Sequence, residues 1–213
     1  MYNSLEECLL DLEKHGHLIR VKEEVDPYLE MAAIHLRVYE AGGPALLFEN
    51  VKGSRFRAAS NIFGTMDRSR FIFRHTWEST RNIIALRNDP IQAIKRPFSH
   101  VKNGLAAYKA LPNQRGNSLP AAAEQIQISD LPLIQHWPMD GGAFVTLPLV
   151  YSEDPDKAGI MNANLGMYRI QLTGNDYELN REIGLHYQIH RGIGVHQSKA
   201  NRDGKPLKVS IFV

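Results

Sequence analysis

The stretch NLGMYRIQL, residues 164–172, has the apolar residues of a β-strand together with polar residues that packing alone does not require. Strands that only build a core alternate apolar residues with indifferent polar ones. Here an amide, a phenol and a guanidinium (Asn164, Tyr168 and Arg169) fall within six residues. In a regular strand Asn164 and Tyr168 lie on one face and Arg169 on the other. We therefore expect a bulge or a bend, or a ligand that meets the strand edgewise.

Asn164 and Arg169 each have a chemical interpretation and a structural one. The neutral amide oxygen of Asn164 suits a hard divalent cation such as Mn²⁺ or Mg²⁺, especially beside a phosphate. The alternative is an edge-strand asparagine that bonds to nearby backbone. Arg169 within a sheet calls for a carboxylate or a phosphate as partner. The alternative is a surface arginine whose stem packs along the sheet while its head stays in water.

A second polar stretch, LHYQIHRG, begins at Leu185. His186 and His190 have the spacing of a helical metal pair, but Tyr187 stands where a zincin motif needs glutamate. As β-structure the two histidines share a face. With Arg191 and His196 nearby, this is the most cation-rich part of the region, and a phosphate is a natural partner. The two glycines of HRGIGV lack the strand and helix context of a dinucleotide fingerprint.

Outward from these stretches, the chain predicts an α+β protein with two domains. Residues 1–112 contain helical and strand patterns, among them a capping box at Ser4 and Glu7 and a helix stop at Gly16. Helical periodicity from 66 to 111 is broken by prolines, and LPNQRGNSLPAA then has linker composition. Residues 113–213 have short segments separated by turn motifs, which predicts an antiparallel barrel or sandwich. The last segment, PLKVSIFV, reads as an apolar core strand without a following partner, so we expect the chain to be a fragment.

Composition excludes several classes of function. A net charge of +2 gives no field for nucleic-acid binding, and a single cysteine, Cys8, allows neither an internal disulfide nor a multi-cysteine metal site. Cys8 falls on the apolar face of the first expected helix, so we do not expect a cysteine nucleophile. The acidic N-terminus and the lack of a long apolar run predict a cytoplasmic protein without a transmembrane segment. The cluster at Trp137 and Asp140-Gly141-Gly142 reads as a plain turn about as well as a functional loop.

Five motifs in order give the chain a family resemblance: GGPALLFENVKG, NIFGT, HWPMDGGAFVT, NLGMYRIQL and HYQIHRGIG. Together they resemble the N-terminal portion of the UbiD family of decarboxylases, from about residue 5 to the end of the chain. The resemblance implies a reversible, non-oxidative decarboxylase of aromatic or α,β-unsaturated carboxylic acids. It implies prenylated FMN made by a flavin prenyltransferase, a divalent metal (usually Mn²⁺) and often K⁺. It also implies an N-terminal α/β domain followed by a split β-barrel that holds the flavin, and a homo-oligomer at full length.

The resemblance also implies roles for particular residues. Asn164 would bind the metal that bridges to the flavin phosphate, and Arg169 would be the catalytic arginine set between two carboxylates beside the substrate. The residues implied to bind the cofactor are Met167, Tyr168, Arg169, His186, Tyr187, Gln188, Arg191 and Gly192. The second metal-binding acid, the acids beside the arginine and the proton donor would follow residue 213. We therefore expect the 213-residue chain alone to be inactive.

Two other functions remain open from the sequence. One is an FMN-binding oxidoreductase on a split barrel, which would react with NAD(P)H. The other is an accessory or scaffold subunit that folds without flavin. The acid used by a decarboxylase is also open, and a polyprenyl-hydroxybenzoate of ubiquinone biosynthesis, a phenolic acid and a cinnamate-like acid all fit.

Overall fold

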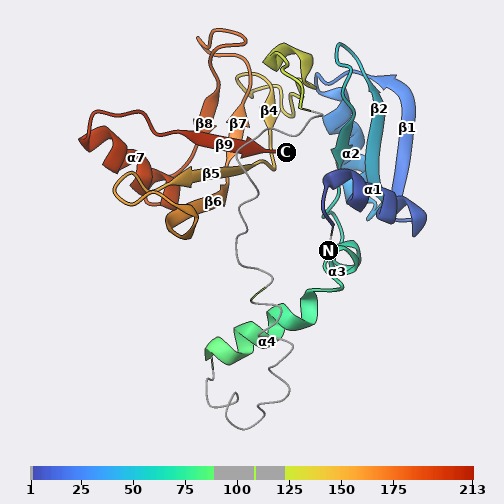
Figure 1. The fold of residues 1–213 in the computed structure, drawn as a ribbon. Helices are drawn as coiled ribbons and strands as arrows, with labels where there is room; N and C mark the ends of the chain where they lie inside the picture. The colour runs from blue at the N-terminus through green and yellow to red at the C-terminus, as the bar shows by residue number, and fades with distance from the viewer. Residues whose placement is uncertain (1, 89–107, 109–122) are drawn as a thin grey trace. The chain divides into compact units, whose positions relative to one another are not determined.

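The computed structural model describes residues 2–88, 108 and 123–213 (Figure 1). The backbone divides into two compact units. The first unit comprises the described parts of Met1–Val21, His35–Leu47 and Ala59–Ser118, and the second comprises Lys22–Ile34, Phe48–Ala58 and the described part of Leu119–Val213. The domain boundary expected near residue 112 lies outside the described residues, and so does the pattern interrupted by Pro90 and Pro97.

The N-terminal part of the chain has the mixed helices and strands that its sequence predicts. Its elements are α1 (Leu5–Lys14), β1 (Leu18–Val25), α2 (Glu30–Glu40), β2 (Ala45–Val51), β3 (Ala58–Ser60), α3 (Met66–Ile72) and α4 (Trp77–Asn88). The three strands form one sheet in the order β1-β2-β3. The prediction of mixed α and β structure is confirmed here.

Helix α1 shows how local sequence sets its ends. The Ser4 hydroxyl accepts a hydrogen bond from the Glu7 amide at 3.2 Å, as the capping motif predicts. The Glu7 carboxylate accepts from the Asn3 amide at 2.7 Å instead of reaching back to Ser4. Gly16 follows the helix with φ of +73°, a left-handed conformation that favours glycine.

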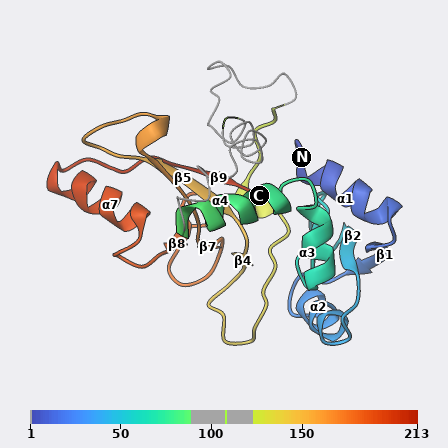
Figure 2. The same cartoon turned by 90° about the horizontal axis from the view of Figure 1, so that it is seen from below.

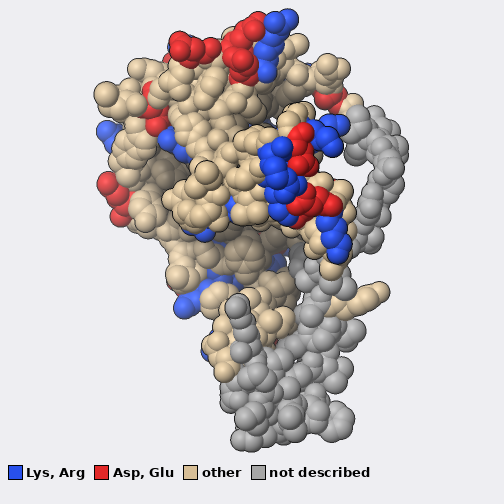
Figure 3. Space-filling model, turned by 90° about the vertical axis from the view of Figure 1, so that its left-hand side faces the viewer, with Lys and Arg blue, Asp and Glu red and all other residues tan. Residues whose placement is uncertain are grey.

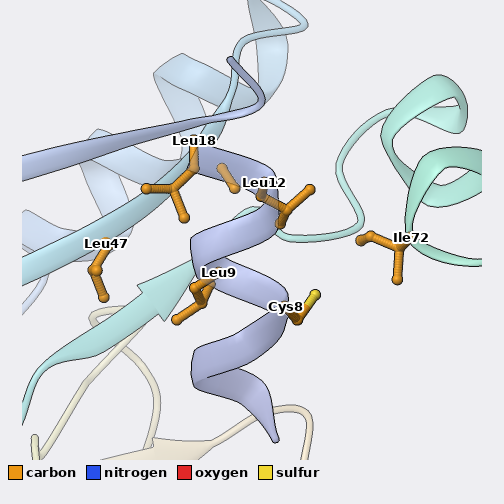
Figure 4. Close-up of a cluster of buried hydrophobic side chains, with 7 residues drawn as sticks. Cys8, Leu9, Leu12, Leu18, Leu47 and Ile72 are labelled. Carbon is orange, nitrogen blue, oxygen red and sulfur yellow. The ribbon is translucent and has the colours of Figure 1, made fainter. Parts of the chain in front are cut away.

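The core of the first unit forms where the apolar face of α1 meets strands β1 and β2 (Figure 4). Leu12 is completely buried, and Cys8 is also buried. Leu9, Leu18, Leu47 and Ile72 complete the side chains labelled in the figure. Cys8 is therefore a packing residue, as its position on the apolar face predicts.

The second unit holds two small antiparallel sheets and one long helix. Its elements after residue 123 are η1 (Ile128–Asp130), β4 (Phe144–Val145), β5 (Leu149–Glu153), η2 (Ile160–Asn162), β6 (Ala163–Met167), β7 (Arg169–Gln171), β8 (Gly184–His186), α7 (Gly192–Arg202) and β9 (Val209–Phe212). One sheet has the order β4-β7-β8 and the other the order β6-β5-β9. Every pairing in the two sheets is antiparallel, as predicted.

The stretch NLGMYRIQL passes from one of these sheets to the other. Its first part is β6, which pairs with β5, and its last part is β7, which pairs with β4 and β8. Tyr168 is the one residue between them. Figure 2 shows β5 beside β9, and β7 beside β8, in the second view of the sheets. The polar residues are thus accommodated by a change of sheet at Tyr168, a bend of the kind that was one of the arrangements expected from the sequence.

Two expectations for this unit are wrong. The sequence predicts an antiparallel β domain over residues 113–213, but Gly192–Arg202 is the helix α7, with Ile193, His196 and Ala200 among its buried residues. His186 ends β8 and His190 lies in the turn before α7, so the two histidines do not share a strand face. The last segment forms the expected strand, β9, which pairs with β5 at the edge of its sheet and has three of its four residues exposed.

Candidate functional site

A cavity of about 580 Å³ lies in the second unit where β6, β7 and β8 meet the turn before α7. Its lining residues are Gly166, Met167, Tyr168, Arg169, His186, Tyr187, Gln188 and Arg191. They come from two short segments nearly 20 residues apart in the sequence, which the pairing of β7 with β8 brings together. Seven of them are residues predicted to bind a cofactor. Gly166 was missed, although it stands inside the quoted motif.

Tyr168 occupies the corner between the two sheets, and Gly166 makes room for it. A Cβ at Gly166 would lie 2.6 Å from the Tyr168 ring and hydroxyl, so any side chain there would force Tyr168 to move. The Tyr168 hydroxyl accepts a hydrogen bond from Asn164 Nδ2 at 3.3 Å. This hydrogen bond uses the NH₂ group of Asn164 and does not involve the Asn164 Oδ1 atom. The Tyr187 ring stands edge-on to Tyr168, with centroids 6.5 Å apart.

Arg169 has the anionic partner that its position in a strand requires. Its Nη2 donates a hydrogen bond of 2.7 Å to Asp140 Oδ2, and its guanidinium carbon lies 3.7 Å from the centroid of the Phe144 ring. The hydrogen bond from Arg169 holds the pKa of the Asp140 carboxyl below its ordinary value. Arg169, which lines the cavity, is 36% exposed, and Asp140 behind it is only 11% exposed. The sequence named Asp140 only within a cluster that fits a plain turn as well as a functional loop, and Phe144 was not predicted, although Arg169 itself signalled the need for an anion.

His186 lies directly opposite Arg169 in the β7–β8 pairing. Its Nε2 is 3.1 Å from Gln171 Oε1, and its ring packs edge-on against Phe144 at a centroid distance of 5.4 Å. Phe144 therefore contacts both Arg169 and His186. One face of this sheet holds the two basic side chains at fixed positions.

The turn before α7 contributes the remaining predicted residues. Arg191 precedes the helix, and its Nε donates to Gln188 Oε1 at 3.2 Å. Arg191 is the N-cap residue of α7, and its side chain makes no capping hydrogen bond to the first turn of the helix. A Cβ on Gly192, the first residue of α7, would lie 2.8 Å from Asn164 Cγ and closer still to its Oδ1. The start of α7 is therefore packed against the amide oxygen of Asn164, the predicted metal ligand.

The described residues do not by themselves form a complete metal centre. Residues 2–88, 108 and 123–213 contain no group of three or more His, Cys, Asp or Glu side chains that could hold a metal ion. Asn164 offers one neutral oxygen, at the start of a helix where an anion is favoured. None of the helices in the described part of the chain is both long and apolar enough to cross a membrane.

Comparison with known proteins identifies the family. The family domain described as the 3-octaprenyl-4-hydroxybenzoate carboxy-lyase N-terminal domain matches residues 9–87, and the Rift-related domain of the same enzyme family matches residues 112–213. The chain belongs to the UbiD family of carboxy-lyases, which confirms the resemblance found in the motifs.

Individual relatives agree with this assignment. A 4-hydroxybenzoate decarboxylase subunit from Chlamydia pneumoniae is 38% identical over 201 residues, which cover 92% of this chain and 32% of that protein. The chain thus spans about a third of the length of that curated relative.

Two solved structures have the same fold. The vanillic acid decarboxylase of Sedimentibacter hydroxybenzoicus in its closed form is 27% identical, with a TM-score of 0.72 over 100% of this chain and 43% of that one. An evolved dimeric form of the UbiD-class enzyme HmfF from Pelotomaculum thermopropionicum, in complex with prFMN, is 25% identical, with a TM-score of 0.64 over 99% and 44%.

Proposed function

We propose that this chain is the N-terminal, flavin-binding part of a prenylated-FMN-dependent decarboxylase of aromatic or α,β-unsaturated carboxylic acids. The observation that carries the proposal is the cavity that gathers both predicted cofactor segments beside Arg169 and the start of α7. The names of the relatives, a 4-hydroxybenzoate decarboxylase subunit and a vanillic acid decarboxylase, favour an aromatic acid. The complex of HmfF with prFMN supports the choice of cofactor.

The residues around the cavity fit a flavin mononucleotide. A volume of about 580 Å³ falls within the range of small-molecule sites. Tyr168 and Tyr187 offer aromatic surface for a ring system, and Arg191 with the uncapped start of α7 offers donors and positive charge for a phosphate. When bound, prenylated FMN supplies the electron acceptor that loss of CO₂ from an sp² carbon requires.

Asn164 is the residue that would hold a divalent metal, because its Oδ1 lies against the start of α7, where a phosphate would bind. Its Nδ2 is occupied by Tyr168, so the oxygen remains for the cation. Mn²⁺ or Mg²⁺ suits a site made of a neutral amide oxygen and phosphate oxygens. The same proposal includes K⁺ as a further bound ion and an additional acidic residue as a second ligand of the divalent metal.

Arg169 would bind and orient the carboxylate of the substrate. A guanidinium presents five N–H donors in a planar fork, and the hydrogen bond to Asp140 uses Nη2. Phe144 holds the flat face of the guanidinium and Asp140 holds one edge, so the direction of the fork is set before substrate arrives. Orienting the scissile carboxylate in this way is the contribution that positioning makes to catalysis.

The first experiment is an FMN titration of the purified 213-residue chain with and without Mn²⁺, followed by flavin fluorescence. We expect binding that Mn²⁺ strengthens and that Arg191→Gln weakens, with Arg181→Gln as the control at an exposed site outside the cavity. The same chain loaded with prenylated FMN should not decarboxylate hydroxybenzoates, whereas a full-length protein carrying it should.

Other outcomes select the other functions. Oxidation of NAD(P)H by the FMN-loaded chain would establish the oxidoreductase and refute the decarboxylase. A stably folded chain that binds no FMN with or without Mn²⁺ would refute the flavin site and favour the scaffold. A cytoplasmic location, a role in ubiquinone biosynthesis, oligomerisation and cofactor supply by a prenyltransferase remain predictions.

A further inference from the structure

A buried polar pair, outside the cavity lining, joins α7 to strand β5. Ser152 Oγ and His196 Nδ1 are 3.0 Å apart, within hydrogen-bond distance. Ser152 is 1% exposed and His196 is 7% exposed, so the pair is shielded from water. A buried pair of this kind is costly to break, because each partner left alone loses its hydrogen bond without regaining water. Neither residue belongs to the motif roles that the family resemblance implies.

The geometry of β5 and β6 relates this pair to Asn164. Ser152 and Asn164 are directly opposite each other in the antiparallel β5–β6 pairing, so they lie on the same face of the sheet. Gly192 and His196 are four residues apart on α7, so they lie on the same face of the helix. The helix therefore meets the sheet at two neighbouring points: Gly192 against Asn164, and His196 against Ser152.

Ion pairs continue the same contact along the helix. Lys199 Nζ lies 2.7 Å from Asp154 Oδ2 and 3.2 Å from Asp156 Oδ2, and Arg202 also pairs with Asp156. On the face shown in the space-filling view of Figure 3, Lys and Arg side chains lie next to Asp and Glu side chains. Partly exposed ion pairs contribute little on their own and tolerate small shifts. The buried Ser152–His196 contact is therefore the more exacting constraint on the rotation and register of α7.

We propose that Ser152 and His196 are positioning residues for the metal and phosphate end of the site. Their contact fixes α7 so that Gly192 stays against Asn164 and the first turn of the helix stays beside Arg191. One carbon added at Gly192 would displace the Asn164 side chain, so a small rotation of α7 changes the surroundings of Asn164 Oδ1. The ligand chemistry in this proposal rests on the proposed function, whereas the positioning of Asn164 does not.

The test compares three variants of the 213-residue chain by FMN affinity with and without Mn²⁺ and by melting temperature. His196→Leu removes the hydrogen bond and keeps an apolar side chain of useful size. His196→Asn restores a polar atom near the position of Nδ1. Ala200→Gly is the matched control, because Ala200 is buried on the same helix and the substitution weakens α7 without removing the Ser152–His196 hydrogen bond.

We expect FMN affinity in Mn²⁺ to fall about 10-fold in His196→Leu, at the lower end of what outer partners of a metal ligand contribute. His196→Asn should recover most of that loss, and Ala200→Gly should bind as wild type despite a lower melting temperature. Wild-type affinity in His196→Leu would overturn the proposal. An equal loss in Ala200→Gly at an equal melting temperature would also overturn it, because helix stability alone would then explain the effect.

A ligand-free measurement separates this proposal from the proposed function. If the wild-type chain binds no FMN, the flavin site fails, and the positioning role is judged by the ¹H–¹⁵N signal of the Asn164 side-chain amide. That signal should shift in His196→Leu and stay unchanged in Ala200→Gly; an unchanged signal in both refutes the role. If His196→Leu does not fold, Ser152→Ala replaces it, since it removes the same hydrogen bond without adding volume.

Discussion

Gly192→Ala is expected to separate metal-dependent flavin binding from folding. The added Cβ would lie 2.8 Å from Asn164 Cγ, whereas ordinary contact begins at 3.4 Å, so the Asn164 side chain must move by at least the difference, 0.6 Å. Metal–ligand distances tolerate only about 0.2 Å. The displacement is three times that tolerance, and we expect Mn²⁺ to lose its effect on FMN affinity, a change of about 10- to 100-fold.

The free energy of unfolding should change by two opposing contributions that partly cancel. Gly192 begins α7 with an ordinary φ, so alanine gains up to about 1 kcal/mol of helix propensity. Overpacking against Asn164 opposes this gain by about 1–3 kcal/mol. The assay is FMN fluorescence with and without Mn²⁺, beside a urea denaturation curve. Val195→Ala, at an exposed position of the same helix, is the control. An undiminished Mn²⁺ effect in Gly192→Ala would refute the placement of the metal at Asn164.

Three further variants test other parts of the structure. Gly166→Ala should weaken FMN binding, because its Cβ would meet the Tyr168 ring at 2.6 Å; unaltered affinity in a fluorescence titration would count against Tyr168 as a flavin contact. Asp140→Asn should lower the free energy of unfolding by a constant amount from about pH 5 to pH 7. That difference should shrink as the pH falls below about 4, because a carboxylate with a depressed pKa stabilises the fold above its ordinary pKa and loses this effect on protonation. Urea denaturation across this pH range measures it, and a difference that grows toward acid would contradict the Arg169 pairing. Leu12→Ala should cost about 2–5 kcal/mol, since Leu12 is completely buried in the first unit, while FMN affinity is expected to stay at the wild-type value.

Local sequence predicts those elements whose ends depend on a few neighbouring residues. Ser4, Gly16 and the apolar spacing of residues between them define α1, because capping and helical periodicity act within one or two turns. The same kind of signal in α7 is weaker. Glycines at its start obscure the buried spacing of Ile193, His196 and Ala200, which is why the sequence favours β-structure in its place.

The motifs alone are enough to recognise the UbiD family, and strand geometry alone shows that Asn164, Tyr168 and Arg169 cannot serve one ligand from a straight strand. How these residues are arranged follows from the folded chain. Tyr168 carries the chain from one sheet to the other, and Arg169 meets Asp140 from 29 residues away in the sequence. Ser152 and His196 are 44 residues apart. Such pairings depend on which strands and helices come together, and the sequence near either partner does not contain that information.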